Sequence, residues 1–361
     1  MPERYVVIMA GGRGERFWPA SRPTTPKHLL PIVGETPMLT QTVERVMGVV
    51  PRENIFVITT QAQLPGVRAA CPMLPEANLV AEPMGRDTAA ATGLAMLLVK
   101  QRAPGAAFAM LPADHVVRDT AEYGRLLATA FAAAEADDVL VTLGIKPTGP
   151  ATGFGYIEQA GLWKKIDGRE VMAVKRFVEK PDLATAQACL ATGRYFWNAG
   201  MFVWRVPVLE AAFRAHASEL HACLAAMEAA ARSRGWAQAL AEGYPQLKKI
   251  SVDYALMEKS TNVVVVPATF DWDDVGAWPA VASHSPKDSA GNVLRGLALV
   301  EGGAGNIIVS TGDHLTAVVG ASDLVVVHTA DATLVCPKDK AQEIKALLKR
   351  LEADAEKRRF L

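Results

Sequence analysis

The stretch that decides the fold is Ala10-Gly11-Gly12-Arg13-Gly14-Glu15-Arg16-Phe17-Trp18-Pro19, which follows directly on the short apolar segment Tyr5–Ala10. That segment is too short for a helix and is typical of a strand buried on both faces. In a layered α/β fold, a loop in this position lies at the carboxyl edge of the sheet, where ligands bind. Its three glycines let the backbone approach a phosphate and turn N–H groups toward it. The stretch therefore predicts a phosphate-binding loop.

Two familiar phosphate loops can be excluded. A Walker loop would end in Gly-Lys-Ser or Gly-Lys-Thr, and this loop does not. A dinucleotide fingerprint needs a glycine where Phe17 stands and a helix beyond it, which the following prolines prevent. The loop should stay extended and carry the cations Arg13, Arg16, Arg22 and Lys27. Fixed cations on an extended loop suit the binding of a triphosphate. The alternative interpretation is a glycine-rich turn whose basic side chains are only solvated, and the sequence favours the first.

Short apolar runs alternate with helical patterns along most of the chain. This alternation predicts an α/β, Rossmann-like layered fold with a mixed, largely parallel sheet. The further strands expected in the first half are Ile55–Thr59, Ala107–Leu111 and Val139–Leu143, and the helices are Pro37–Val46, Thr88–Gln101 and Thr120–Ala136. Later in the chain, strands are expected at Phe154–Glu158 and Val171–Glu179, and a helical stretch from Pro207 to about Leu240.

Composition narrows the class of protein. The 361 residues carry 38 Lys and Arg against 38 Asp and Glu, so the balance of charge argues against a nucleic-acid binder held by bulk electrostatics. The four cysteines, Cys71, Cys189, Cys223 and Cys336, are far apart, as expected for a reduced, cytoplasmic protein. The sequence predicts no signal peptide and no membrane contact, because no stretch approaches the ~20 apolar residues of a membrane-spanning helix.

A resemblance to a known family rests on two motifs. Gly11-Gly12-x-Gly14-x-Arg16-Phe17-x-Pro19 followed by Pro26-Lys27-x-x-Leu30-Pro31 resembles the signature of the sugar-1-phosphate nucleotidyltransferases. The resemblance implies that Arg16 meets the β and γ phosphates and that Lys27 also serves the phosphates. It implies nucleotide binding by Ala10, Gly11, Gly12, Arg13 and Gly14 in the loop, and by Pro83, Gly85, Asp87 and Thr88 in a turn that enters a helix.

The reaction of this family brings two polyanions together, so a divalent cation is expected. Asp114 follows the strand Ala107–Leu111, and Asp274 lies in the acidic, tryptophan-rich stretch Phe270–Trp278. Alone, each could be a turn-forming acid. The resemblance assigns the metal to Asp114 and Asp274, in preference to Asp271 and Asp273. Mg²⁺ suits one or two carboxylates plus phosphate oxygens, although another divalent cation such as Mn²⁺ remains open.

Three more segments contain candidate residues for binding the sugar phosphate. Glu179-Lys180-Pro181 closes a strand-like run, where a Glu-Lys pair is most often a surface ion pair. The resemblance instead implies that Lys180 contacts the sugar phosphate and that Glu179 binds sugar hydroxyls. It also implies that the catalytic residues are Arg16, Lys27, Lys180 and Asp114. It adds Gly155, Tyr156, Asn198 and Gly200 to the sugar pocket.

The resemblance implies GTP and mannose 1-phosphate as partners. Family members that use GTP usually have other residues where this chain has Asp87, Ala90 and His28, so the base preference rests on the family and not on these residues. Two alternatives stay open: a transferase for glucose 1-phosphate with UTP or dTTP, and a non-catalytic scaffold subunit.

A polar, turn-rich stretch near residue 288 predicts a catalytic domain at 1–288 and a small C-terminal domain at 289–361. The latter should hold β-rich segments and a final helix over Lys338–Phe360. Because no repeat of fixed period is visible, no β-helix is expected there. Because no His/Glu cluster follows, a single activity is expected. The segment could dock on the main domain or pair two chains as a homodimer.

Overall fold

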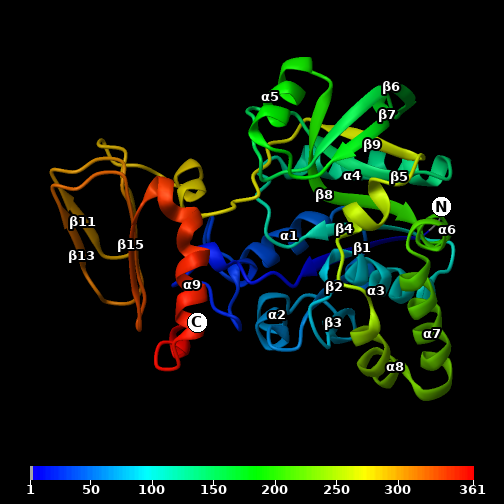
Figure 1. Ribbon diagram of the computed structural model, residues 1–361, viewed down its shortest axis with the longest axis horizontal. Coiled ribbons are helices and arrows are strands. Elements are labelled where there is room, and N and C mark those ends of the chain that lie inside the picture. The colour runs from blue at the N-terminus through cyan, green and yellow to red at the C-terminus, as the bar shows by residue number, and fades with distance from the viewer. Residues whose placement is uncertain (1–2) are drawn as a thin grey trace.

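A nine-stranded sheet forms the centre of the larger body in the computed structural model, which describes residues 3–361 (Figure 1). The strands lie in the order β3-β2-β1-β4-β8-β5-β9-β7-β6. The first four are parallel to one another: β1 (Arg4–Ala10), β2 (Ile55–Thr60), β3 (Leu79–Glu82) and β4 (Ala107–Pro112). The expected α/β fold with a mixed sheet is confirmed.

The other half of the sheet is mostly antiparallel. It contains β5 (Leu140–Ile145), β6 (Tyr156–Ile166), β7 (Arg169–Val178), β8 (Tyr195–Arg205) and β9 (Val263–Ala268). Only β5 and β9 pair in parallel there. The long strand β8 joins the two halves, because it pairs antiparallel with β4 on one side and with β5 on the other.

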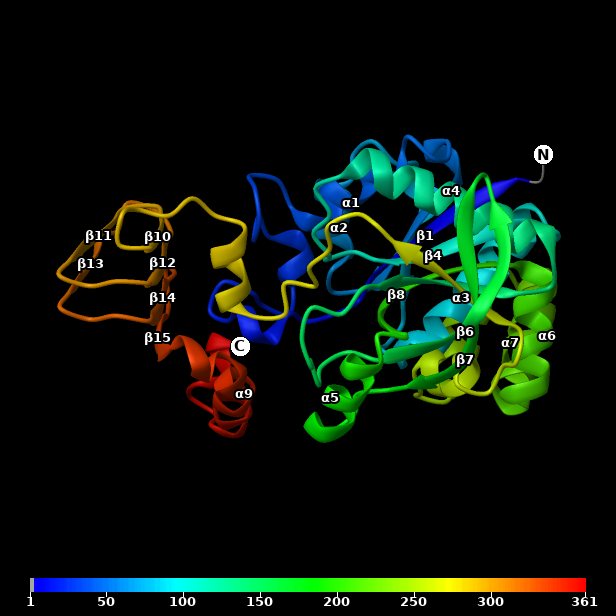
Figure 2. The same cartoon turned by 90° about the horizontal axis from the view of Figure 1, so that it is seen from above.

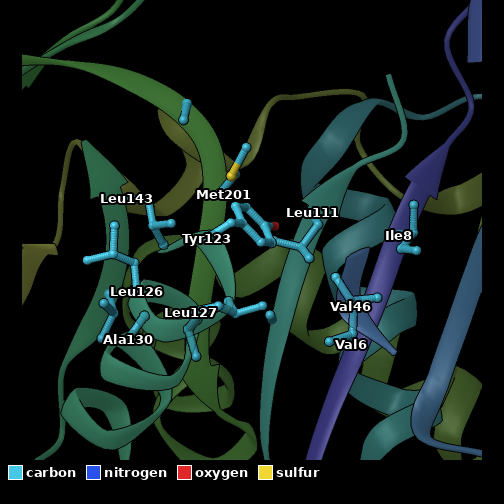
Figure 3. Packing of buried hydrophobic residues seen from close by; sticks show 14 of the residues in the cluster. Val6, Ile8, Val46, Leu111, Tyr123, Leu126, Leu127, Ala130, Leu143 and Met201 are labelled. Atoms are coloured by element: carbon cyan, nitrogen blue, oxygen red, sulfur yellow. The ribbon is translucent and has the colours of Figure 1, made fainter. Parts of the chain in front are cut away.

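Both faces of the sheet are covered. Val6 and Ile8 of β1 point into one core with α1 (Met38–Val46), α2 (Leu64–Ala70) and α4 (Thr120–Ala136). Figure 3 shows side chains of α4 in this core beside Leu143 and Met201 of the sheet. Tyr5 and Val7 point the other way, into a second core. The alternation of one strand between two apolar layers explains its uninterrupted hydrophobicity.

The second core is built on α3 (Asp87–Arg102), whose residues 89–99 are all buried. The expected helical stretch after Pro207 packs over it as three helices, α6 (Val206–His216), α7 (Ser218–Arg234) and α8 (Trp236–Gly243). Gly235, with φ 87°, ends α7. The remaining helix of this body, α5 (Leu183–Thr192), joins β7 to β8.

The expectation that the C-terminal segment contains no β-helix is wrong. Its strands β10 (Val293–Arg295), β12 (Ile307–Ser310) and β14 (Leu324–His328) stack in parallel, as do β11 (Ala298–Glu301) and β13 (Thr316–Val319). The last strand, β15 (Thr333–Pro337), pairs antiparallel with β14. Figure 2 shows this coiled stack at one end of the molecule.

The coils of this β-helix differ in length, so a search of the sequence for a repeat of fixed period does not detect it. Val293 pairs with Ile307, 14 residues on, and Ile307 pairs with Val325, 18 residues on. A ladder of buried asparagines replaces a sequence repeat. The Asn292 side-chain oxygen accepts the Asn306 N–H at 2.8 Å, and the Asn306 oxygen accepts the Leu324 N–H at 3.0 Å. These bonds satisfy buried backbone groups between coils.

The final helix is shorter than expected: α9 covers Ile344–Ala353, and short 3-10 turns precede and follow it. The apolar residues of α9 pack against the larger body as well as against the C-terminal strands. They pack in one cluster with Phe17, Trp18, Val275 and Trp278 of the larger body. Figure 1 accordingly shows α9 between the strand stack and the N-terminal part of the chain. The two segments thus share a core next to the phosphate loop.

Candidate active site

The loop after β1 takes the extended course that its prolines predict. Only a single 3-10 turn, Glu15–Phe17, interrupts it. Gly14 has φ 62°, and a Cβ on it would lie 2.4 Å from the Cβ of Lys27. Both its conformation and its contact therefore require glycine. This close approach sets Lys27 directly behind the loop.

Lys27 lies at the centre of the site. Its ammonium group donates to Asp114 Oδ2 at 2.9 Å and to the backbone oxygen of Asp274 at 2.6 Å. Asp114 comes from the end of β4 and Asp274 from a loop after β9, so the fold brings together three residues far apart in sequence. Burial opposes ionisation of Asp114, but the charges of Lys27 and His115 outweigh it and lower the pKa to about 2. Burial raises the pKa of Asp274.

The neighbouring acids have other partners. Asp271 accepts the backbone N–H groups of Arg118 and Asp119, both at 2.9 Å. Asp273 holds the Nε2 of His284 at 2.7 Å. Of the three acids in this stretch, only Asp274 borders the cavities described next.

A cavity of about 380 Å³ opens beside the loop. Its walls include Arg13, Arg16, Lys27, Asp114 and Asp274, and also Lys345 from α9. Within residues 3–361, Arg13 and Arg16 form no ion pair and no side-chain hydrogen bond, so their charge is available to an anion. The structure thus places the predicted phosphate and metal residues around one cavity.

A second cavity, of about 290 Å³, adjoins the first. It is bordered by the predicted sugar residues Gly155, Glu179, Lys180, Asn198 and Gly200. Gly155 lies so close to Glu179 that a Cβ would fall 2.4 Å from its Oε2. The Asn198 amide donates to Asp253 Oδ1 at 2.7 Å.

Tyr156 is the predicted sugar residue that the fold places elsewhere. Its side chain is fully buried in the core and does not border the second cavity. Its hydroxyl donates to the backbone oxygen of Ala151 at 2.9 Å. Since side chains alternate along a strand, Tyr156 points away from the face toward which its neighbour Gly155 opens.

The two cavities share His115 and Asp274. Burial lowers the pKa of His115 to about 4, and its Nδ1 accepts the Trp272 indole N–H at 3.1 Å. The imidazole is therefore neutral at pH 7. Lys180 and Val275, with φ of 44° and 45°, hold strained backbone beside this junction.

The predicted nucleotide segment lies next to the loop. Gly11 faces Glu82, since a Cβ on Gly11 would come 3.6 Å from Glu82 Oε2. Gly12, Pro83, Gly85 and Asp87 are exposed, whereas Ala10 is buried at the end of β1 and Thr88 borders the second cavity. The residue Asp87 has φ 67°.

The N-terminus of α3 is less free than its sequence indicates. The Ala89 N–H donates to the Ile250 oxygen at 3.1 Å, and the Thr88 hydroxyl accepts the Val252 N–H at 2.8 Å. The segment 250–252 therefore occupies part of this helix end, so any ligand there meets fewer free N–H groups than expected.

Sequence reasoning missed several residues of the site, among them Asp253 and Lys345. Asp253 has a pKa raised to about 6 by burial and by the charge of Glu179, and it sits in no recognisable motif. Lys345 comes from the C-terminal segment, for which docking on the main domain was expected but no residue was assigned to the site. Neither residue could be assigned without the tertiary structure.

Comparison with known families defines the class. The model of the nucleotidyl transferase family matches residues 5–291. The chain therefore belongs to the nucleotidyl transferase family, and it is an enzyme of a family that uses a divalent metal. A second model, the MannoseP isomerase/GMP-like beta-helix domain, matches residues 300–351 and agrees with the coiled C-terminal strands.

Individual relatives are similar over nearly the whole chain. The Xanthan biosynthesis protein XanB of Xanthomonas campestris pv. campestris (strain B100) is 39% identical over 96% of this chain and 73% of its own length. A mannose-1-phosphate guanylyltransferase of Sinorhizobium fredii (strain NBRC 101917 / NGR234) is 37% identical over 98% of this chain and 69% of its own. A crystal structure from Thermus thermophilus, called a mannose-1-phosphate geranyltransferase, is 36% identical, with a TM-score of 0.85 over 97% of this chain and 99% of that one.

No helix within residues 3–361 is long and apolar enough to cross a membrane.

Proposed function

We propose that this enzyme transfers GMP from GTP to α-D-mannose 1-phosphate, giving GDP-mannose and pyrophosphate. The observation that carries the proposal is the pair of adjoining cavities that share His115 and Asp274. One has cations in its wall, and the other is bordered by Lys180 and Asn198. A triphosphate tail and a sugar phosphate entering from the two sides would meet at the shared wall. The names of several relatives support the choice of GTP and mannose 1-phosphate.

The nucleotide would lie along Ala10–Gly14 and the segment from Pro83 to Thr88. Arg13 and Arg16 have no protein counter-ion within residues 3–361, and they would bind the β and γ phosphates. Lys27 would stabilise the charge that develops on the phosphates, because its ammonium group is already fixed by two hydrogen bonds. A fixed cation needs no reorganisation when the charge appears.

The sugar phosphate would lie in the second cavity. Lys180, paired with Glu179, would orient the phosphate, and Glu179 and Asn198 would bind sugar hydroxyls. Gly155 and Gly200 would leave room for the ring, and Gly200 donates its N–H to the Asn198 side chain at 3.1 Å, which fixes that amide. Tyr156 would support the loop and make no sugar contact.

Asp114 and Asp274 have the chemistry of a divalent metal site. Both flank the same ammonium group, and both border the first cavity. Within residues 3–361 no group of three or more His, Cys, Asp or Glu side chains could hold a metal, so substrate oxygens and water would supply the other ligands. This donor set suits Mg²⁺, which we propose as the ion. When bound, the ion would neutralise phosphate charge.

The bond changes need no protein base. An oxygen of the sugar phosphate forms a bond to the α-phosphorus, and the bond from that phosphorus to the bridging oxygen breaks. Pyrophosphate leaves with the electron pair. Because the attacking oxygen is already ionised, the residues contribute by positioning and electrostatics.

Pyrophosphate release tests the proposal. Purified protein with Mg²⁺ should release pyrophosphate from GTP only when mannose 1-phosphate is added, and Asp114→Ala should abolish release. Release with glucose 1-phosphate and UTP or dTTP alone would overturn the substrates but keep the mechanism. A lack of release with any pair would favour the scaffold alternative.

Three further proposals concern the whole chain. We propose a catalytic domain over 1–288 and a small domain over 289–361, with a cytoplasmic location supported by four free cysteines. We also propose a homodimer, because Leu299 and Val319 of the C-terminal strands, and Leu297 and Leu315 just before them, expose 51–77% of their surface. Light scattering that finds a monomer at micromolar concentration would overturn the dimer.

A further inference from the structure

One wall of the phosphate cavity comes from the C-terminal segment. Lys345, in the first turn of α9, borders this cavity together with Arg13, Arg16 and Lys27. These residues belong to opposite ends of the chain. We propose that Lys345 is a phosphate-binding residue, which contacts the pyrophosphate portion of the nucleotide and the departing pyrophosphate. This inference rests on the proposed function.

Packing fixes the position of α9 against the loop. Ile344 is 3% exposed and lies in the cluster that contains Phe17 and Trp18. The Trp18 indole donates to the Phe360 backbone oxygen at 2.7 Å, and Arg22 donates to the same oxygen at 3.0 Å. Arg22 also pairs with Asp331 at 2.6 Å. The residue before Lys345 is therefore held in the core next to the loop, which leaves Lys345 directed along the edge of the cavity.

The charges of the cavity leave Lys345 available to an anion. Lys27 is engaged by Asp114. Within residues 3–361, Arg13, Arg16 and Lys345 form neither an ion pair nor a side-chain hydrogen bond. The acids Glu15 and Asp274 also border this cavity, but within residues 3–361 neither forms an ion pair with these three cations. A pyrophosphate group is therefore able to form charge-assisted hydrogen bonds with them.

The helix dipole does not account for Lys345, because the 3-10 turn Lys338–Glu343 runs directly into α9 and Lys345 does not lie at a free helix end. A solvated surface lysine is the alternative. Lys349 serves as the comparison, because it lies one turn further along the same helix and borders only the neighbouring cavity, which lies between α9 and the loop. Lys345 borders both.

The test compares Lys345→Ala and Lys345→Arg with the matched control Lys349→Ala. Synthesis is assayed with GTP varied and with mannose 1-phosphate varied, and the reverse reaction is assayed with pyrophosphate varied. Binding of pyrophosphate with Mg²⁺ to each full-length variant is measured by calorimetry. For Lys345→Ala we expect KM for GTP and for pyrophosphate, and Kd for pyrophosphate, to rise about 10-fold, the effect of one charge-assisted hydrogen bond.

The other readouts separate binding from folding. KM for mannose 1-phosphate should stay within about twofold, Lys345→Arg should retain most of the affinity, and Lys349→Ala should match the unaltered chain. An unchanged pyrophosphate Kd in Lys345→Ala, or an equal loss in Lys349→Ala, would overturn the inference. If the unaltered chain binds pyrophosphate through Lys345 but has no transferase activity, the proposed function fails, and of the inference only the pyrophosphate contact of Lys345 stands. If it does not bind pyrophosphate, the inference fails.

Discussion

Replacing Gly14 with alanine should disable the enzyme through Lys27. Alanine at φ 62° costs about 1–2 kcal/mol in backbone strain. Its Cβ would lie 2.4 Å from the Lys27 Cβ, whereas carbon atoms in contact need about 3.5–4.0 Å. Lys27 must therefore move by about 1 Å, and such overpacking typically costs a further 1–3 kcal/mol or so. We expect a total loss of about 2–5 kcal/mol in the free energy of unfolding.

The loss of activity follows from the same displacement. A shift of about 1 Å in a catalytic group can reduce the rate about 100-fold. We therefore expect kcat/KM, measured by pyrophosphate release, to fall about 100-fold in Gly14→Ala. Gly193→Ala is the matched control, because Gly193 has φ 65° but a Cβ there would meet nothing within 4 Å. It should lose only the strain of about 1–2 kcal/mol and keep full activity.

A double-mutant cycle decides whether Lys27 transmits the effect. In a Lys27→Ala background, Gly14→Ala should reduce activity by only a few-fold more, because the displaced group is already gone. Two results would refute the reasoning. One is a full 100-fold loss in the Lys27→Ala background, and the other is equal destabilisation of Gly14→Ala and Gly193→Ala in urea.

Three more outcomes are expected. Burial raises the pKa of Glu82 to about 7, so its contribution to stability is present below its ordinary pKa and is lost as pH rises through about 7. The free energy of unfolding of Glu82→Gln, measured in urea, should therefore rise relative to that of the unaltered chain by up to about 3 kcal/mol from pH 5 to pH 8. A difference between the two chains that does not change with pH would contradict this. Gly155→Ala should raise KM for mannose 1-phosphate at least about 10-fold and leave KM for GTP nearly unchanged, because its Cβ would displace Glu179; equal effects on both would argue against it. Removal of divalent metal by EDTA should abolish pyrophosphate release, and added Mg²⁺ should restore it, whereas activity that persists in EDTA would exclude the metal role of Asp114 and Asp274.

Local sequence was enough for the loop and for most of the parallel strands, although it did not reveal β3 (Leu79–Glu82). The run Tyr5–Ala10 forms β1, and the prolines after Gly14 keep the loop out of a long helix, as predicted. These features depend on neighbouring residues, since strand burial follows from an apolar run and helix exclusion follows from proline. For the same reason the sequence placed Asp114 correctly at the end of a strand.

Some features depend on contacts between segments far apart in the chain. The coils of 14 and 18 residues are joined by hydrogen bonds from Asn292 and Asn306, which no fixed period reveals. The direction of the Tyr156 side chain depends on the placing of β6 in the sheet, which turns Tyr156 into the first core and Ile157 into the second. Strand pleating permits either face, and only the packed neighbours choose.

The candidate site likewise has one part that local sequence determines and another that depends on tertiary contacts. The phosphate loop consists of consecutive residues, because a tight backbone turn needs particular residues next to one another. Its walls are not consecutive: Lys27 meets Asp114 and Asp274 across the fold, and Lys345 reaches the cavity because α9 packs on Phe17 and Trp18. The sequence by itself determined the chemistry of the loop and the class of enzyme. The tertiary structure decided which distant side chains complete the site, because burial of apolar surface brings them together without any local signal.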